Sequence, residues 1–297
     1  MMFYLLYRIG YFFAMNLPIK ISYTAACAVA DIWCRFSSAD RNAVMANLNV
    51  ITANGSDPKT IKRMTRDVFR NFAKYLVDFF RFQKIDPDYI KSHISIEGLE
   101  KLDKALAKGK GVVALSAHIG NWELGGVILA SMRQPMKAVA LPHKNKRVND
   151  FFTKQRMTGN MVPIGTNSSL RSCYDLLKTG GILALLGDRD FSKNGVFVEF
   201  FGKPALMPKG PAAFGIRLGS EIVPVFMIRT HDDMFRLIFE SPVPKPSFGD
   251  DDRDTDELLK RCVAVIERYV KEYPTQWYMF KKMWNGDEKS VHTHTVI

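Results

Sequence analysis

The sequence lacks the signatures of several common enzyme classes. It contains neither the Gly-x-Ser-x-Gly elbow of a serine hydrolase nor the His-Glu-x-x-His motif of a zinc peptidase. Its six histidines show no metal-ligand spacing, so we predict no metal site. The Gly-x-x-x-x-Gly-Lys-Ser/Thr spacing of a phosphate-binding loop is also missing, which argues against P-loop nucleotide chemistry.

Cysteine is scarce in this chain. The four cysteines are Cys27, Cys34, Cys173 and Cys262, and no two of them form a Cys-x-x-Cys pair. If Cys27 and Cys34 share a helix, they lie about 10 Å apart along its axis, which is too far for a disulfide. We therefore predict four reduced thiols in a reducing compartment.

A long uninterrupted apolar run is missing as well. Residues 3–35 are apolar and aromatic, but charged residues and Pro18 interrupt them. Residues 3–17 are short for a membrane-spanning helix, and no cleavage site or basic n-region marks a signal peptide. They fit an interfacial anchor with Arg8 and Lys20 near lipid headgroups. On the residues alone, an amphipathic helix packed on the protein's own core fits equally well.

The charge balance is strongly basic. The formal net charge is +12 and the pI is near 9.5, so an anionic partner is expected. Nucleic acid, acidic lipid and an acidic carrier protein all satisfy that expectation. Because the basic residues are dispersed and form no recognised nucleic-acid-binding motif, we predict no nucleic-acid partner.

The order of apolar patterns predicts the fold class. Residues 41–50 and 60–82 show helical periodicity, and beyond residue 94 short apolar runs alternate with helical patterns. That alternation predicts an α/β fold, with a mostly parallel mixed sheet covered by helices and a helical segment at the N-terminus. The expected division is residues 1–35 for the helical segment and 36–290 for the α/β domain. The expected strands are 94–97, 112–117, 137–141, 182–186, 196–201, 222–228 and 235–240, and residues 250–254 are expected to form a solvated acidic turn before a helix at 257–273.

One stretch carries the chemistry. Residues 112–117 read as a buried strand that brings His118 to its carboxyl end, and Asn121 can cap the helix that follows. His118 and Glu123 would lie about 140° apart on a straight helix, but they can converge if His118 is in the turn. Histidine suits a general base near neutral pH, and a carboxylate can fix its tautomer. On spacing alone, a structural histidine remains the simpler interpretation.

Ligand sites in such sheets gather at the carboxyl ends of strands. His118, the basic loop at residues 143–147 and the acidic residues at 188–190 each follow a predicted strand. We therefore expect these three segments to face one cleft.

The string Ser116-Ala-His118-Ile-Gly-Asn-Trp-Glu123-Leu-Gly-Gly126 resembles the signature of the bacterial lipid A late acyltransferases, the lauroyl and myristoyl transferases. That family lies within the wider glycerolipid acyltransferase superfamily, and the resemblance extends from about Ser95 to Tyr278. It implies that His118 is a general base and Glu123 its partner. It also implies an acyl thioester as co-substrate, with no cofactor and no covalent acyl-enzyme.

The resemblance implies further site residues. Arg156 matches an important arginine of the family, and the family's Asp-Gln-Asp motif reads Asp188-Arg189-Asp190 here. Arginine suits a phosphate on a lipid acceptor, so Arg156, Asp188, Arg189 and Asp190 are expected to bind substrate. From the residues alone, Arg156 reads as a solvated helix charge and the two aspartates as turn or Arg-paired carboxylates.

Lysines in a third block complete the expected site. Residues 201–211 resemble another motif block of the family, and Lys209 is expected to bind substrate. Either Lys203 or Lys209 could instead lie in solvent, and we favour solvent for Lys203. Trp122 and Trp277 are expected to be packing residues.

The resemblance thus implies an O-acyltransferase of lipopolysaccharide biosynthesis. It would move an acyl chain from acyl carrier protein or coenzyme A to a hydroxyl of an anionic lipid A precursor. Because family members commonly carry an N-terminal membrane-anchoring helix, residues 1–35 are expected to associate with the cytoplasmic face of the bacterial inner membrane. The alternative acceptor is a phosphatidylinositol mannoside or a glycerophospholipid, although the mannoside enzymes tend to carry Asp where this chain has Glu123. A catalytically inert membrane scaffold is the other class, and the intact His118/Glu123 pair argues against it.

Overall fold

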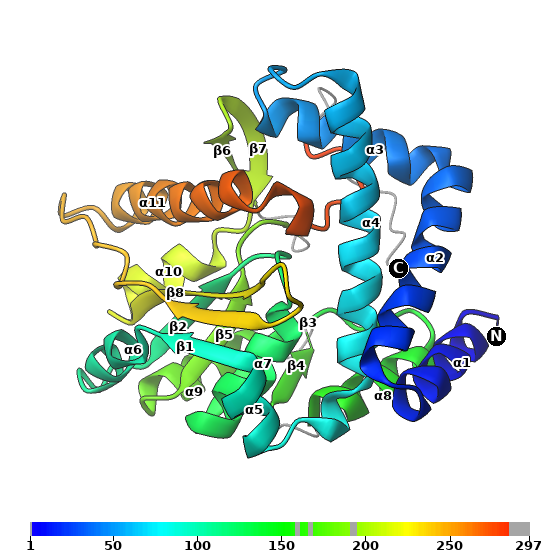
Figure 1. Cartoon of the computed structure of the whole chain (residues 1–297). Helices are drawn as coiled ribbons and strands as arrows, with labels where there is room; N and C mark the ends of the chain where they lie inside the picture. The colour runs from blue at the N-terminus through cyan, green and yellow to red at the C-terminus, as the bar shows by residue number, and fades with distance from the viewer. Residues whose placement is uncertain (1, 158–160, 166–168, 191–194, 285–297) are drawn as a thin grey trace.

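The computed structural model of the chain describes residues 2–157, 161–165, 169–190 and 195–284. Four helices come first: α1 (Met2–Asn16), α2 (Ile19–Phe36), α3 (Ser38–Ile51) and α4 (Pro58–Phe80). The longest of them, α4, begins at Asp57, whose side chain accepts from the backbone N–H groups of Lys59 and Thr60. In Figure 1 α4 stands between the sheet on one side and α1 and α2 on the other.

A seven-stranded sheet forms the centre of the remaining chain. Its order is β1-β9-β8-β2-β5-β3-β4, and β8 and β9 pair antiparallel while the other neighbours pair parallel. The predicted mostly parallel mixed sheet is therefore confirmed. The strands are β1 (Ile94–Glu97), β2 (Val112–Ser116), β3 (Met136–Ala140), β4 (Val162–Gly165), β5 (Ile182–Leu186), β8 (Glu221–Arg229) and β9 (Phe235–Phe239).

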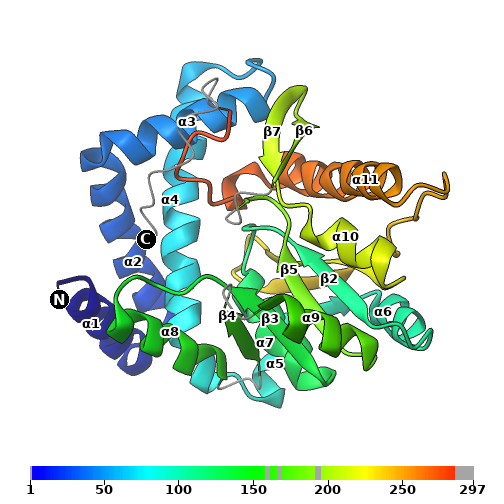
Figure 2. The same ribbon diagram turned by 180° about the vertical axis from the view of Figure 1, so that it is seen from behind.

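Helices cover both faces of this sheet, as Figures 1 and 2 show from opposite sides. One face packs on α9 (Ser169–Lys178), α10 (Gly210–Arg217) and α11 (Asp251–Glu272), and the other packs on α6 (Leu99–Leu106) and α7 (Trp122–Met132). Along β2, Val113 and Leu115 enter the first core while Val112 and Ala114 enter the second. A strand buried on both faces needs a continuous apolar run, which residues 112–115 provide.

Short elements complete the chain. These are a 3-10 turn (Phe82–Lys84), α5 (Pro87–His93), α8 (Lys146–Met157), a hairpin of β6 (Val196–Phe200) and β7 (Lys203–Met207), and a second 3-10 turn (Pro274–Gln276). The sequence did not indicate β4 or β7. Because β4 is four residues long and lies at the sheet edge, it carries little periodicity. In the hairpin, Phe201 and Gly202 both have positive φ, as a tight two-residue turn requires.

Within the acidic stretch at residues 250–254, residues 251–254 are helical, which corrects the expected solvated turn. Asp250 caps α11 by accepting from the backbone N–H of Arg253, and three aspartates occupy the first turn. Carboxylates near a helix N-terminus interact favourably with its unpaired N–H groups and its dipole. The acidic run therefore begins the helix instead of preceding it.

The first two helices are buried on one side and apolar on the other. In α1, Ala14 is buried and Tyr7 and Tyr11 pack edge-to-face against aromatic rings of α4 and α8. The opposite side of α1 exposes large apolar side chains by 45% to 60%; these are Leu5, Leu6, Ile9, Phe12 and Phe13. One side of α1 therefore packs on the protein's own core, and binding of its other side to a membrane stays a prediction. Within the described residues, no helix combines the length and apolar character needed to cross a membrane.

The cysteines agree with the expected thiols. Cys27 and Cys34 do share α2, and all four cysteines are free. Burial raises the pKa of Cys262 to about 12, so this thiol stays protonated at neutral pH.

Candidate active site

His118 and Asp188 lie opposite each other at the carboxyl ends of β2 and β5. The two parallel strands pair Ser116 with Leu186, so two residues further on the same register sets His118 beside Asp188. The imidazole Nδ1 is 2.8 Å from Oδ1 of Asp188, and the backbone N–H of His118 donates to Oδ2 at 3.1 Å. The carboxylate therefore holds both the ring and the backbone of the histidine.

Asp188 is fully buried and hydrogen-bonded on both oxygens. Besides the contacts with His118, Oδ2 accepts from the indole N–H of Trp277 at 2.9 Å. Burial alone would raise the pKa of this carboxyl, but His118 and the charge of Arg189 lower its pKa below the usual range. The group is thus ionised at neutral pH and accepts a hydrogen bond from the Nδ1–H group of the neutral imidazole.

The other ring nitrogen of His118 has the properties of a base. Because Nδ1 carries the proton, Nε2 is the unprotonated atom of the neutral ring. Burial lowers the pKa of His118, the charge of Arg189 lowers it further, and Asp188 and Glu123 act in the opposite direction. The pKa lies below its ordinary value, so the ring is neutral at pH 7 and able to take a proton.

Glu123 is bonded to Arg156, and the hydrogen bond expected between Glu123 and His118 goes to Asp188 instead. Nε of Arg156 donates to the two oxygens of Glu123 at 3.1 and 2.9 Å, and Nη2 donates to Oε1 at 2.5 Å. The side chains are only 8% and 12% exposed. The predicted orienting role of Glu123 is corrected accordingly: at the start of α7 it faces the last turn of α8, and it acts on His118 through its charge.

This ion pair gives Arg156 a structural role, which competes with the substrate binding expected from the sequence. A guanidinium that donates three hydrogen bonds to a buried carboxylate braces α8 against α7. Binding of an acceptor phosphate by Arg156 stays a prediction. It would require sharing the guanidinium between the phosphate and Glu123.

The turn that carries His118 is locked to two distant segments. Gly120 has a φ of +61°, and a Cβ there would lie 1.9 Å from the carbonyl oxygen of Met227, so only glycine fits. The N–H of Gly120 donates to the carbonyl of Gln276 at 2.9 Å, and the N–H of Tyr278 donates to the carbonyl of His118 at 2.9 Å. An antiparallel bridge between Ile119 and Trp277 also joins the turn to residues 276–278.

Two tryptophans contact the histidine pair. Trp122 meets the His118 ring edge-to-face with centroids 5.1 Å apart, and it stacks on Tyr75 of α4 at 4.5 Å. The packing interpretation of Trp122 is thereby confirmed. Trp277 is also buried, but its bond to Asp188 gives it a place in the site that the sequence did not indicate.

Arg189 fits the binding of an anion. Its guanidinium donates to the carbonyl of Tyr278, and its buried Nε has no hydrogen-bond partner among the described residues. Burial lowers the pKa of Arg189. A poorly solvated guanidinium with a spare donor, next to the base, can bind a phosphate or carboxylate.

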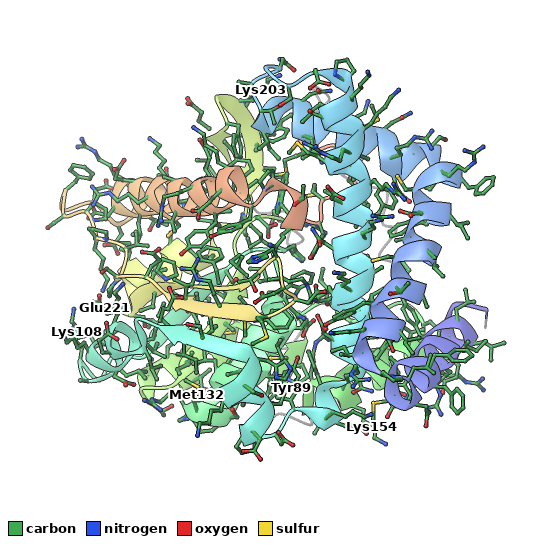
Figure 3. All side chains as sticks on the ribbon, viewed as in Figure 1. Tyr89, Lys108, Met132, Lys154, Lys203 and Glu221 are labelled. Carbon is green, nitrogen blue, oxygen red and sulfur yellow. The ribbon has the colours of Figure 1, made fainter. Side chains whose placement is uncertain are left out.

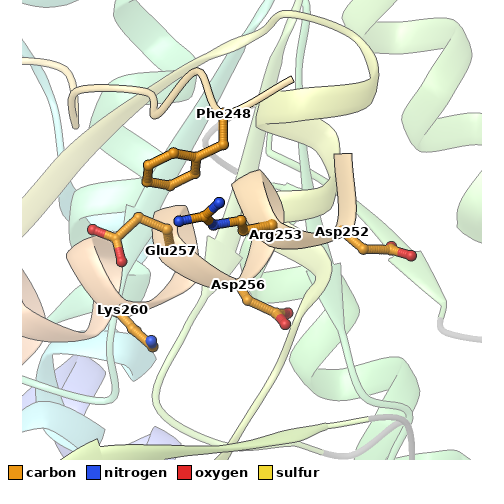
Figure 4. A pocket seen from close by; sticks show the side chains of 6 residues that line it. All are labelled: Phe248, Asp252, Arg253, Asp256, Glu257 and Lys260. Carbon is orange, nitrogen blue, oxygen red and sulfur yellow. The ribbon is translucent and has the colours of Figure 1, made fainter. Parts of the chain in front are cut away.

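Asp190 and Lys209, the remaining predicted residues, contact other groups. Asp190 accepts from the backbone N–H of Gly195 at 3.0 Å. Lys209 forms an ion pair with Asp256 of α11 at 3.1 Å, and Asp256 lines a hollow at the N-terminal part of α11 where Arg253 lies over Phe248 (Figure 4). None of the six residues that line this hollow is a predicted site residue. Lys203 is exposed at the start of β7, in agreement with the solvent interpretation (Figure 3).

The expected convergence of three strand ends is confirmed in part. The two strand ends that carry His118 and Asp188 meet directly. The loop after β3 brings His143 against Phe152 of α8, with ring centroids 4.4 Å apart, and burial and the charge of Arg156 lower the pKa of His143. This loop therefore reaches the ion-pair side of the site. Among the described residues, no group of three or more His, Cys, Asp or Glu side chains could hold a metal ion.

The fold and this site together define an α/β protein with a histidine–carboxylate base at two strand ends. Comparison with known families places it more closely. Residues 1–286 match the family described as bacterial lipid A biosynthesis acyltransferase, and the chain belongs to that family.

Curated relatives fall in the same family and act on two kinds of lipid. The phosphatidylinositol mannoside acyltransferase of Mycolicibacterium smegmatis is 25% identical over 284 residues, which cover 94% of this chain and 91% of the relative. The lipid A biosynthesis palmitoleoyltransferase of Escherichia coli is 26% identical over 218 residues, covering 73% of this chain and 69% of the relative. Membership of this family supports a transferase activity.

The ion pair of Glu123 and Arg156 leads to a stability prediction. Glu123→Gln leaves a buried guanidinium without its counter-charge, so the free energy of unfolding should fall by about 3–5 kcal/mol. Asp150→Asn, which breaks the exposed pair of Lys146 and Asp150, should cost at most about 0.5 kcal/mol. Urea unfolding of both variants measures the difference. Equal losses would contradict the buried role of the pair.

The charge of Arg189 leads to a pH prediction. Because Arg189 lowers the pKa of His118, Arg189→Gln should raise that pKa and leave more of the base protonated at low pH. The acid limb of kcat/KM for acyl transfer should therefore move to higher pH in this variant. Lys203→Gln, which removes a charge from the exposed hairpin, should leave the limb in place. An acid limb that stays fixed or moves down in Arg189→Gln would contradict the electrostatic role of Arg189.

Proposed function

We propose that this protein transfers a fatty acyl chain from an acyl thioester to a hydroxyl of a lipid A precursor, with His118 as general base and Asp188 as its orienting carboxylate. The observation that carries the proposal is the neutral, partly buried imidazole hydrogen-bonded through Nδ1 to an ionised carboxylate. Family membership supports the reaction class. The chemistry of the site supports the roles within it.

The reaction needs one base and no covalent enzyme intermediate. Nε2 of His118 takes the proton of the acceptor hydroxyl as its oxygen attacks the thioester carbonyl carbon. Asp188 stabilises the imidazolium that forms, as a carboxylate on Nδ1 does in hydrolytic triads. Collapse of the tetrahedral intermediate breaks the carbon–sulfur bond, and the imidazolium returns its proton to the leaving thiolate.

The substrates are proposed from charge. Acyl carrier protein and acyl-coenzyme A are both anionic donors, and a net charge of +12 attracts either of them. Arg189, whose charge acts on His118 and whose Nε has no hydrogen-bond partner among the described residues, is the proposed contact for a phosphate of the acceptor. No cofactor beyond the thioester takes part in the proposed reaction.

A phosphatidylinositol mannoside is the second candidate acceptor. The observation that favours it is the long match to the Mycolicibacterium smegmatis mannoside enzyme, which covers 94% of this chain. The family described as lipid A biosynthesis acyltransferase and Glu123 in place of Asp support the first candidate. A glycerophospholipid acceptor would use the same base.

We further propose that α1 and α2 bind the cytoplasmic face of the bacterial inner membrane. Besides the apolar side of α1, α2 exposes four large apolar residues: Ile21, Val29, Ile32 and Phe36. Each such side chain is worth about 1.5–3 kcal/mol when fully buried, whereas a Lys or Arg near an anionic surface adds roughly 1 kcal/mol. Apolar insertion therefore dominates the proposed attachment.

The proposed base is tested by substitution in the full chain. His118→Ala should reduce kcat for acyl transfer by about 10²–10⁴-fold, because the hydroxyl loses its proton acceptor. Asp188→Asn should also lose most activity, because an amide can present its N–H to Nδ1 and favour the wrong tautomer. Dodecanoyl and tetradecanoyl thioesters of acyl carrier protein and coenzyme A, assayed with a lipid A precursor in detergent, measure the effect.

His93→Ala, a histidine on α5 that stacks on Tyr89, is the matched control and should leave transfer within about twofold of wild type. Near wild-type turnover in a folded His118→Ala protein would contradict the mechanism.

Mass spectrometry of lipids from cells with and without the protein distinguishes the acceptors, because one added acyl chain appears on lipid A, on the mannoside or on a glycerophospholipid.

Membrane attachment is tested without disturbing the core. A quadruple variant removes apolar contact with the membrane but keeps the packed side of α1. It replaces four exposed residues by Gln: Leu5, Ile9, Phe12 and Phe13. Wild-type protein should stay on anionic vesicles in high salt, whereas this variant should bind weakly and wash off in salt. The double variant Phe197→Gln/Phe248→Gln, which removes exposed apolar residues elsewhere, is the control and should bind as wild type. If wild type washes off in salt as readily as the quadruple variant, the attachment proposal is wrong.

A further inference from the structure

A buried carboxylate on α4 lies outside the proposed chemistry but next to the turn that carries it. Asp78 is only 4% exposed and accepts three hydrogen bonds. The hydroxyl of Tyr23 on α2 donates to Oδ1 at 2.5 Å, and the side-chain amide of Asn121 donates to Oδ2 at 2.9 Å. The guanidinium of Arg229 on β8 also donates to Oδ2. Burial raises the pKa of Asp78, and these three donors act in the opposite direction.

Asn121 connects this carboxylate to the turn between His118 and Glu123. Its side-chain oxygen caps α7 by accepting from the N–H of Leu124 at 3.1 Å, and its own backbone N–H donates to Met227 at 2.8 Å. The amide nitrogen of the same side chain is the group that donates to Asp78. Asp78 therefore fixes the rotation of the cap residue, and with it the path of the chain from β2 into α7.

Arg229 carries the network to further elements. It also donates to the Tyr23 hydroxyl at 3.1 Å and pairs with Asp233 at 3.4 Å, and Asp233 pairs with Lys74 of α4 at 2.7 Å. Burial alone would lower the pKa of Arg229, but the charge of Asp78 raises it above the ordinary value. The guanidinium stays charged, and Tyr23 and Phe235 flank it.

Stability alone does not account for such a cluster. A buried ion pair often contributes little net stability compared with apolar residues of the same size, and its best-attested benefit is a defined arrangement. Here the cluster defines the arrangement of α2, α4, β8 and the His118 turn at a single point. We propose that Asp78 is a positioning residue for the base, acting through Asn121, and that Tyr23 makes this positioning depend on the docking of α2. The inference rests on the proposed role of His118.

The chain offers a matched control for this idea. Asp31 of α2 receives bidentate hydrogen bonds from Arg66 and Arg70 of α4, at 2.6 to 2.8 Å. This carboxylate joins the same two helices as Asp78 and Tyr23 do, but it makes no contact with the His118 turn. Asp31→Asn therefore weakens the α2–α4 contact without touching the positioning network.

The experiment compares Asn121→Ser and Tyr23→Phe with Asp31→Asn in the full-length protein. Serine can still cap α7 but loses the donor to Asp78, and phenylalanine removes only the Tyr23 hydroxyl. Asp78→Asn is less informative, because it leaves Arg229 buried without its counter-charge and can prevent folding. Tm is measured for every variant, so that losses of activity can be compared between variants that lose the same stability.

For transfer from dodecanoyl thioesters to a lipid A precursor, we expect kcat to fall about 10–100-fold in Asn121→Ser and about three- to tenfold in Tyr23→Phe. KM for the thioester should stay within about twofold, because the donor contacts are unchanged. Asp31→Asn should keep kcat within about twofold even where its Tm falls as far as that of Tyr23→Phe. The proposal is overturned if both network variants keep wild-type kcat, or if Asp31→Asn loses as much as they do.

A second readout does not depend on acyl transfer. The Nδ1 proton of His118, held on Asp188, should give a low-field NMR signal that is absent from His118→Ala. Wild type and Asp31→Asn should retain the signal, whereas Asn121→Ser should broaden or lose it through faster exchange with water. An unchanged signal in Asn121→Ser overturns the positioning role. If wild type transfers no acyl group but the signals behave as expected, the proposed function fails while the positioning role stands.

Discussion

Two parallel strands that lie side by side fix each residue of one beside a single residue of the other, and this lateral register is what the site depends on. Between β2 and β5 the pairing of Ser116 with Leu186 leaves His118 and Asp188 facing each other where the strands end. A slip of one residue would turn one of the two side chains to the opposite face of the sheet. The apolar residues of both strands, buried on two faces, therefore set the histidine pair as well as the core.

The site holds its charges in pairs, and each pair has a different surrounding. Asp188 faces a histidine that can take up and release a proton at Nε2, so this pair is suited to general-base catalysis. Glu123 faces an arginine that stays charged, so that pair is suited to bracing α7 against α8. Both carboxylates lie near the imidazole and both raise its pKa, but only the first touches it. The contact, more than the spacing along the chain, assigns the roles.

The sequence was a good guide to what is local. The strand before His118, the Asn121 cap and most strands follow from periodicity and from capping residues that act within a few positions. The partner of His118 did not follow, because Asp188 reaches it across the sheet while Glu123 is the nearer carboxylate in the chain. Trp277 and Asp78 gave no signal either: an indole and a carboxylate in helical or apolar surroundings look like packing and surface charge until the fold brings them to the turn. The expected acidic turn failed for the opposite reason, since a local rule for helix starts applied and was not used.

The segment that closes the site is nearly the last part of the described chain. Gln276, Trp277 and Tyr278 supply the carbonyl for Gly120, the indole for Asp188 and the N–H for His118. A chain leaves the ribosome N-terminus first, so α1 and α2 emerge long before these three residues. The apolar side of these helices is thus synthesised while the histidine turn still lacks the three residues that hold it. During synthesis, the surface proposed to bind the membrane is therefore complete before the proposed base is held in place.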